Sequence, residues 1–192
     1  MATKIEIINM ALISLRSNAI ELPLEDTENG IKMDAIYDIV LKSMLREHPW
    51  SFAKKEVALA LVSGVPGTPI LEDYTYIFAL PTYPDFLKLL KTSVEPDYSH
   101  KIKGIYLYSN ASAVSIEYVY FNDDPTTYDA EFTDAFAARL AAELCFSITA
   151  DKDLVKVKWQ EYIGKMRMAK SSNGQEVTPD SPQNDEWLNS RL

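Results

Sequence analysis

The feature that most constrains the fold of this chain is a change in the spacing of its apolar residues. Between residues 1 and 50 they recur every three or four positions, which is the period of an amphipathic helix. Between residues 51 and 125 they alternate or gather in short runs bounded by turn residues, as in strands. After residue 126 the helical period returns. Helices, then strands, then helices predict an α+β fold: a helical bundle formed by the N-terminal and C-terminal helices, with a small antiparallel β-sheet inserted between them.

Two segments near the N-terminus carry a helical apolar stripe. We expect them to form helices over residues 3–16 and 28–47. The second helix is expected to end at His48, because a residue that precedes proline avoids the helical region.

The central region contains runs typical of strands. We expect strands over residues 54–62, 74–79, 104–109 and 114–121. The last two flank the short segment 110–113 and are predicted to pair as a hairpin. The segment 84–90 fits either a short helix or a strand.

The C-terminal region has an apolar residue at every fourth position from Phe132 to Ile148, which predicts a long helix that breaks near residues 149–151. A last helix is expected over residues 153–170, with the following side chains directed inward: Leu154, Val157, Tyr162 or Trp159, Ile163 and Met166. An extended polar tail follows. The predicted divisions are therefore 1–50, 51–125, 126–172 and 173–192.

Composition limits the classes of partner. The net charge of −9 argues against tight binding to nucleic acid, which requires cationic side chains, although an acidic wall that DNA slides past is compatible with it. No signal peptide and no apolar run of about 20 residues is recognisable, so we expect a protein of a cytosol-like, reducing compartment with no membrane association.

The residue types that most often carry catalysis or bind zinc are scarce. Cys145 lies in an alanine-rich run and is expected to be a small buried side chain. His48 and His100 are far apart in the sequence, and neither belongs to a known catalytic or zinc motif. We therefore predict no catalytic residues, no metal site and no cofactor.

The densest carboxylate pair is Asp123 with Asp124, followed by Pro125. We interpret it as a turn that leads into a helix, where Asn and Asp side chains satisfy backbone donors. Because pairs of carboxylates also perform glycan hydrolysis, a tail-associated glycan hydrolase that uses Asp123 or Glu143 is kept as an alternative function.

Two groups of side chains are candidates for contact with a partner. Lysines and an arginine concentrate on the last predicted helix, among them Lys156 and Lys165; they form either a solvated face or a surface that pairs with an acidic neighbouring subunit, with contact to DNA as a further alternative. Tyrosines alternate along the predicted hairpin and either pack at the rim of the core or form an interface. These are Tyr106, Tyr108, Tyr118 and Tyr120.

Several segments together resemble one family, the head-to-tail adaptor of short-tailed bacteriophages, also called tail tubular protein A. The segments occur in the family's order. They are IINMALISLRSNAIELPLED, REHPWSFAKKEVAL, YTYIFALPTYPDFLKLLKTS, VSIEYVYFNDDPTTYDAEFTDAFAARLAAELCFSITAD and the ending DEWLNSRL. The resemblance covers about residues 3–192, and its specificity lies in the order and spacing of the segments.

The resemblance implies a structural virion protein that is not an enzyme. Members of the family form a dodecameric ring between the portal protein and the tail nozzle protein, and DNA passes through the lumen without sequence-specific binding. The expected location is the head-tail interface of the virion, after assembly in the host cytoplasm. A bacterial helical adaptor unrelated to phage remains a further alternative.

The C-terminal tail ends in apolar and cationic residues although the segment before them is polar and contains two prolines. Tryptophan and arginine are typical anchors of interfaces. Since the tail of the family reaches the portal, we expect a portal-binding group at the end of the chain. Its residues are Trp187, Leu188, Arg191 and Leu192.

Overall fold

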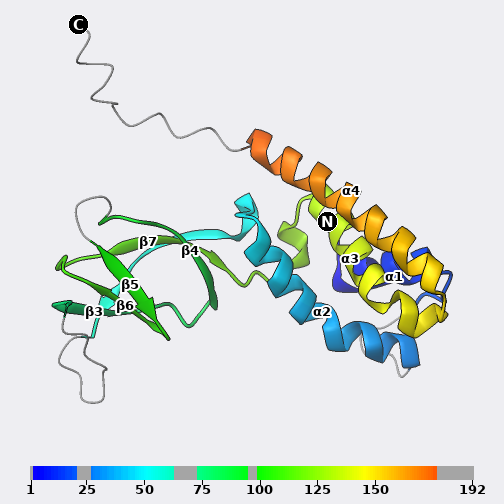
Figure 1. Ribbon diagram of the computed structural model, residues 1–192, viewed down its shortest axis with the longest axis horizontal. Helices are drawn as coiled ribbons and strands as arrows, with labels where there is room; N and C mark the ends of the chain where they lie inside the picture. The colour runs from blue at the N-terminus through cyan, green and yellow to red at the C-terminus, as the bar shows by residue number, and fades with distance from the viewer. Residues whose placement is uncertain (1, 21–26, 63–72, 95–98, 177–192) are drawn as a thin grey trace, which may run out of the picture.

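The computed structural model describes residues 2–20, 27–62, 73–94 and 99–176. These residues form a mixed α+β fold with four α-helices and two small antiparallel sheets. The helices gather at one end of the molecule and the strands at the other (Figure 1). We call these two ends the helical part and the β part.

The helical part consists of α1 (Lys4–Ser14), α2 (Glu28–Glu47), α3 (Ala130–Thr149) and α4 (Lys152–Glu176). The bounds of α2 are those expected from the sequence. The last helix is longer than expected, because α4 continues to Glu176 and the predicted start of the tail at residue 173 lies inside it. The reason is tertiary: Asn173 is 3% exposed and accepts a hydrogen bond from the Ser51 backbone, which stabilises the polar end of the helix.

Helix α3 is the central element of the helical part and packs against each of the other three helices. Its expected apolar stripe is confirmed, since Phe132, Phe136 and Leu140 are fully buried. Alanines on its flanks are buried as well and permit close packing of neighbouring helices. They are Ala135, Ala137, Ala138, Ala141 and Ala142. Cys145 is buried and free, as expected.

Trp50 joins the end of α2 to α3 and to the start of the β part. Its indole is fully buried and donates a hydrogen bond from Nε1 to the Met44 carbonyl over 3.0 Å. Its ring lies edge-on to Phe132 at 4.8 Å and next to Phe52, which itself contacts Phe132. This aromatic group sets where the chain leaves the helices and enters the short 3-10 turn Ser51–Ala53.

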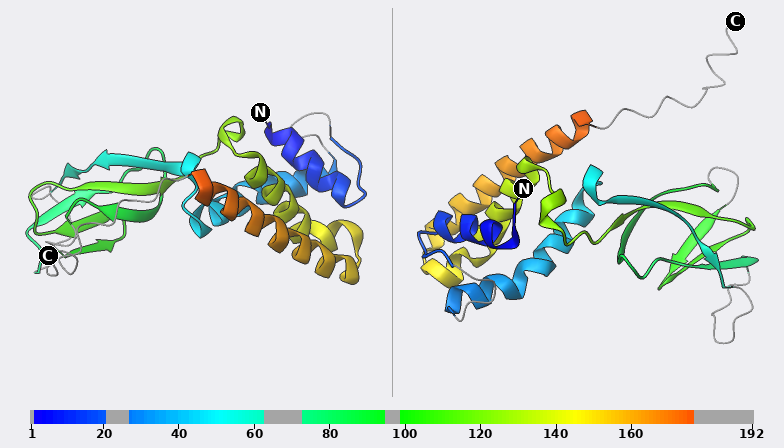
Figure 2. Two further views of the ribbon diagram at one scale, coloured as in Figure 1. Left: turned by 90° about the horizontal axis from the view of Figure 1, so that it is seen from above. Right: turned by 180° about the vertical axis from the view of Figure 1, so that it is seen from behind.

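The β part contains two antiparallel sheets. One has the strand order β1 (Lys54–Ala58), β7 (Ser115–Tyr120), β4 (Phe86–Thr92). The other has the order β2 (Ala60–Leu61), β3 (Tyr76–Ala79), β6 (Tyr106–Ser109), β5 (His100–Lys103). A second hydrophobic core lies between them and includes Phe78, Leu107, Ile116 and Tyr118. The sheets therefore stack face to face (Figure 2).

The predicted hairpin of residues 104–109 and 114–121 is wrong. Strands β6 and β7 belong to different sheets, β6 pairing with β3 and β5, and β7 pairing with β1 and β4. Both strands carry apolar side chains that are buried, and Leu107 of β6 and Ile116 of β7 belong to the same second core. The two strands therefore pack face to face across the core instead of pairing edge to edge.

Two further expectations for this region are revised, and one open alternative is settled. The strand predicted over 54–62 is divided at Leu59 between the two sheets as β1 and β2. The ambiguous segment 84–90 belongs to a strand, β4, and His100 begins strand β5 although no strand was expected there.

The two parts meet through contacts between α2 and the sheet β1-β7-β4. Arg46 donates a hydrogen bond from Nη1 to the Leu87 carbonyl over 2.6 Å. Asn122 is buried and donates to the Phe52 carbonyl at 3.0 Å and to Thr127 Oγ1 at 2.8 Å. Leu87 and Val119 also belong to the core of the helical part. Polar and apolar contacts together thus hold the two parts against each other.

The helix α3 ends at a residue with a left-handed backbone that is not glycine. Ala150 has φ 54° and donates its N–H to the Phe146 carbonyl over 3.0 Å.

Because an L-residue in the left-handed backbone conformation is strained by roughly 1 kcal/mol, we expect Ala150→Gly to raise the free energy of unfolding by about 1 kcal/mol. Chemical denaturation measures it. The control Ala35→Gly, within α2, should lower that energy by about 1 kcal/mol; destabilisation by both substitutions would contradict the prediction.

Candidate interaction surfaces

The cations of α4 differ in the ion pairs that they form with other residues of the chain. Lys165 bonds Asp134 of α3 at 2.8 Å and Glu161 at 3.2 Å. Burial lowers the pKa of Lys165, but these hydrogen bonds outweigh burial and the pKa is raised. Lys156 has a side chain 82% exposed and only a loose pair with Asp153 at 3.6 Å. Of the two lysines expected to form an interface, Lys165 joins α3 to α4, and Lys156 faces solvent.

Arg139 of α3 is a second connection between these helices. Its guanidinium lies over the rings of Trp159 and Tyr162, at 4.5 and 4.9 Å. It also pairs with Glu143 at 2.7 Å, so this carboxylate, one of the two named for the glycan hydrolase alternative, is engaged by an arginine of its own helix.

The tyrosines expected at an interface are divided between the core and the surface. Tyr108 and Tyr118 are 0% and 2% exposed and belong to the interior of the β part, so their assignment to a surface is corrected. Tyr106 and Tyr120 are half-buried. The Tyr120 hydroxyl donates to the Phe52 carbonyl at 3.3 Å, and Lys55 lies over its ring at 4.3 Å.

Several large apolar side chains of the helical part face outward. Val157 and Ile163 were expected to point inward, but they are 59% and 38% exposed. Tyr162 and Met166 are buried as expected, and Ala169 is buried beside them. Other apolar side chains of the helices are more than half exposed, and they lie at positions outside the buried stripes that sequence reasoning followed. They are Ile13, Ile31, Ile39, Phe146 and Met168.

The β part has an exposed apolar region near its junction with α2. Tyr83 is 95% exposed in the turn between β3 and β4, where the Tyr83–Pro84 peptide bond is cis. Ile105 is 59% exposed and lines a cavity of about 390 Å³ that Lys42 and Asp85 also border. Lys42 lies 3.7 Å from Asp85.

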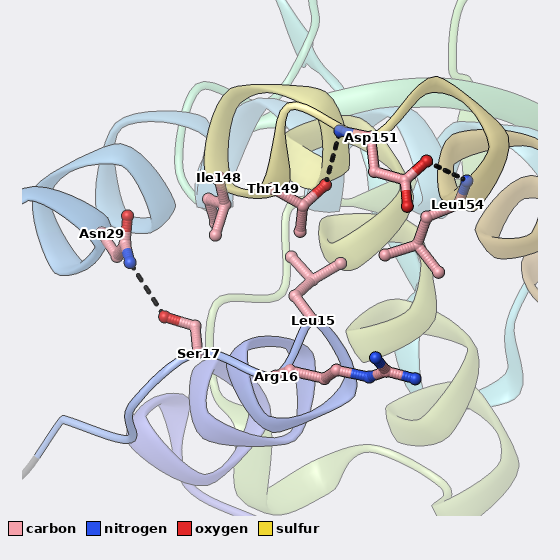
Figure 3. A pocket seen from close by; sticks show the side chains of 8 residues that line it. All are labelled: Leu15, Arg16, Ser17, Asn29, Ile148, Thr149, Asp151 and Leu154. Carbon is pink, nitrogen blue, oxygen red and sulfur yellow. Dashed lines mark hydrogen bonds between the residues drawn. The ribbon is translucent and has the colours of Figure 1, made fainter.

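A polar cavity of about 340 Å³ lies where four helix ends meet (Figure 3). Its lining residues are Leu15, Arg16, Ser17, Asn29, Ile148, Thr149, Asp151 and Leu154. The Asp151 carboxylate accepts hydrogen bonds from the N–H groups of Asp153 and Leu154, at 2.9 and 3.1 Å. Asn29 donates to Ser17 over 2.8 Å. Most of these polar groups therefore stabilise helix ends, while Arg16 extends an exposed guanidinium at the rim.

Of the pair Asp123 and Asp124, Asp124 has the structural role expected of it. Asp124 caps the 3-10 turn Pro125–Thr127 and accepts hydrogen bonds from Thr126 N at 3.0 Å and Thr126 Oγ1 at 2.7 Å. These bonds lower the pKa of the Asp124 carboxyl. Within the ranges that the structure describes, no group of three or more His, Cys, Asp or Glu side chains is arranged to hold a metal ion.

His48 closes α2 and joins it to the end of α4. The Ser51 N–H donates to Asn173 Oδ1 at 2.8 Å, which orients the amide so that its Nδ2 faces His48 Nε2 at 3.0 Å. The amide nitrogen can only donate, so His48 Nε2 accepts and the imidazole is neutral. Burial, with the charges of Lys170, Lys54 and Lys88, lowers the pKa of His48 and outweighs the opposing charge of Glu47.

This geometry predicts a loss of stability in acid. Because the folded pKa of His48 lies below its ordinary value of 6.5, the unfolded chain binds the proton more readily, and the free energy of unfolding falls as the pH falls below about 6.5. We expect Asn173→Asp, which places a carboxylate at Nε2, to raise the pKa above that of the native protein. An NMR titration of the imidazole measures it, with His100 as the internal control; an unchanged His48 pKa would count against the contact.

The candidate tail group at Trp187, Leu188, Arg191 and Leu192 lies outside the described residues. Its role therefore stays a prediction.

Comparison of the chain with models of known protein families gives no match, and neither does comparison with curated proteins. Among the described residues, none of the helices is both long and apolar enough to cross a bilayer.

Proposed function

We propose that this chain is a structural protein of a phage virion, a ring-forming adaptor that joins the portal to the tail nozzle and forms part of the DNA channel. The observation that carries the proposal is the distribution of exposed apolar side chains. They lie on separate faces of the helical part and again at the surface of the β part, as in Ile39, Met168 and Tyr83. A protein that contacts neighbours on several sides needs such surfaces.

The architecture supports the same proposal. In this proposal the helices form the bundle that builds a dodecameric ring, and the β part, inserted between α2 and α3 in the sequence, extends to the nozzle. Hydrogen bonds from Arg46 to the Leu87 carbonyl and from Tyr120 and Asn122 to the Phe52 carbonyl join the helical part to the β part, which suits an element that holds two neighbours together. The tail, residues 177–192, is assigned to the portal.

The net charge of −9 suits a conduit. An acidic wall does not retain DNA, because DNA binding depends on cations that displace counterions from the phosphates. DNA would therefore pass through the lumen without sequence-specific contacts.

The proposal predicts assembly on a portal. We expect the purified chain, mixed with the portal protein of the same virus, to form a complex that contains one ring of this chain for each portal. Mass photometry measures the added mass. A mixture in which portal and chain remain separate at micromolar concentrations would rule the proposed function out.

The tail assignment is tested by a single side chain. We expect Trp187→Ala to weaken attachment to the portal by about tenfold or more, since buried tryptophans are frequent hot spots of interfaces. Asn184→Ala, a change in the same tail, is the control and should bind as the native chain does. Thermal unfolding should be the same for both variants. Equal affinities for the portal would show that the tryptophan is not an anchor.

A further inference from the structure

One exposed face lies along α2. Ile31, Ala35 and Ile39 follow one another at intervals of one helical turn, and Asp38 lies beside them. Ile31 is 56% exposed and Ile39 is 69% exposed. The opposite side of α2 is buried against the helical core through Met33, Tyr37 and Leu41. We call the residues Ile31, Ala35, Asp38 and Ile39 the α2 face.

A second exposed face lies along α4. Val157, Gly164 and Met168 are spaced so that they share one side of the helix, and Arg167 borders them. Val157 is 59% exposed and Met168 is 63% exposed. We call the residues Val157, Gly164, Arg167 and Met168 the α4 face.

Gly164 is a notable residue on this face. Glycine within a helix is less favourable than alanine, and a Cβ added to Gly164 would meet no atom within 4 Å, so packing within the chain does not require it. A glycine on an exposed face allows another backbone or a bulky side chain to approach closely. Together with the exposed Val157 and Met168, it forms an exposed apolar surface that has no side chain at its centre.

The two faces carry opposite charge. Among the residues that define the faces, the α2 face carries the carboxylate of Asp38 and the α4 face carries the guanidinium of Arg167. Neither Asp38 nor Arg167 forms an ion pair with another described residue. A contact between the same face of two copies would bring equal charges together. A contact between the α2 face of one copy and the α4 face of another brings opposite charges together.

The position of the faces permits a repeating contact. Helix α3 packs against both α2 and α4, which lie on either side of it (Figure 1). We infer that the α2 face of one copy of this chain binds the α4 face of the next copy, with Ile31 and Ile39 against Val157, Gly164 and Met168. A contact between two different faces repeats from copy to copy and closes into a ring when the rotation permits. The inference rests on the proposed function and names its subunit contact.

Cross-linking between two variants tests this pairing directly. Ile39→Cys and Met168→Cys are purified separately, mixed in equal amounts and treated with a short thiol-to-thiol cross-linker at high protein concentration. Both positions are exposed, so the fold should persist, and the native Cys145 is buried. We expect several-fold more cross-linked dimer in the mixture than in either variant alone.

The matched control is Ile13→Cys, because Ile13 on α1 is 63% exposed, as is Met168. Mixed with Ile39→Cys, it should give only the background level of dimer. If the mixture of Ile39→Cys and Met168→Cys stays at that background, the inference is overturned. If Ile39→Cys alone cross-links most efficiently, the contact is a symmetric one between two α2 faces, and the inference is again overturned.

Failure of this pairing and failure of the proposed function have different signatures. A chain that assembles on the portal but gives only background cross-linking remains an adaptor whose subunits meet through other faces. A chain that cross-links as expected but never joins the portal has the subunit contact without the proposed function. Cross-linking repeated on the assembled portal complex should give the same pair of thiols.

Discussion

The burial of Trp50 is the interaction on which the rest of the structure depends. The indole fills the space between the end of α2 and Phe132 of α3, and its N–H is satisfied by the Met44 carbonyl, so a large side chain is buried without an unpaired donor. The chain that leaves this site passes Phe52, whose carbonyl accepts hydrogen bonds from Tyr120 and Asn122 of the β part. One aromatic group thus sets both the packing of the helices and the direction of the strands.

The surfaces follow from this arrangement. Once α3 occupies the centre of the helical part, α2 and α4 each have one buried side and one side turned to solvent. Cations inside the fold, such as Arg139 and Lys165, are already used to hold α3 and α4 together. The residues that are available to contact a partner are the exposed ones outside the core, and these include apolar side chains of α2 and α4. This division between internal and external contacts is the physical basis for the adaptor proposed here.

The helices could be predicted closely because their signals are local. The bounds of α2, the stripe from Phe132 to Ile148 on α3 and the turn at Asp124 depend on spacing and capping within a few residues. The strand pairing could not be predicted in this way. Residues 104–109 and 114–121 resemble a hairpin locally, but they pair with strands of two different sheets, and Leu107 and Ile116 are buried together between those sheets. The same limit applies to Val157, whose apolar character alone does not show which side of α4 meets the core.

The sequence by itself determined the helix-strand-helix order of its three regions, the acidic balance and the position of Trp187, because each is a property of neighbouring residues or of composition. The tertiary structure alone decided that Tyr108 and Tyr118 are interior residues, that Asn173 orients the imidazole of His48, and which apolar side chains remain exposed. The physical reason is that burial and hydrogen-bond partners are shared between segments far apart in the sequence. Which side of a helix faces solvent is known only when the elements that pack against its other side are known.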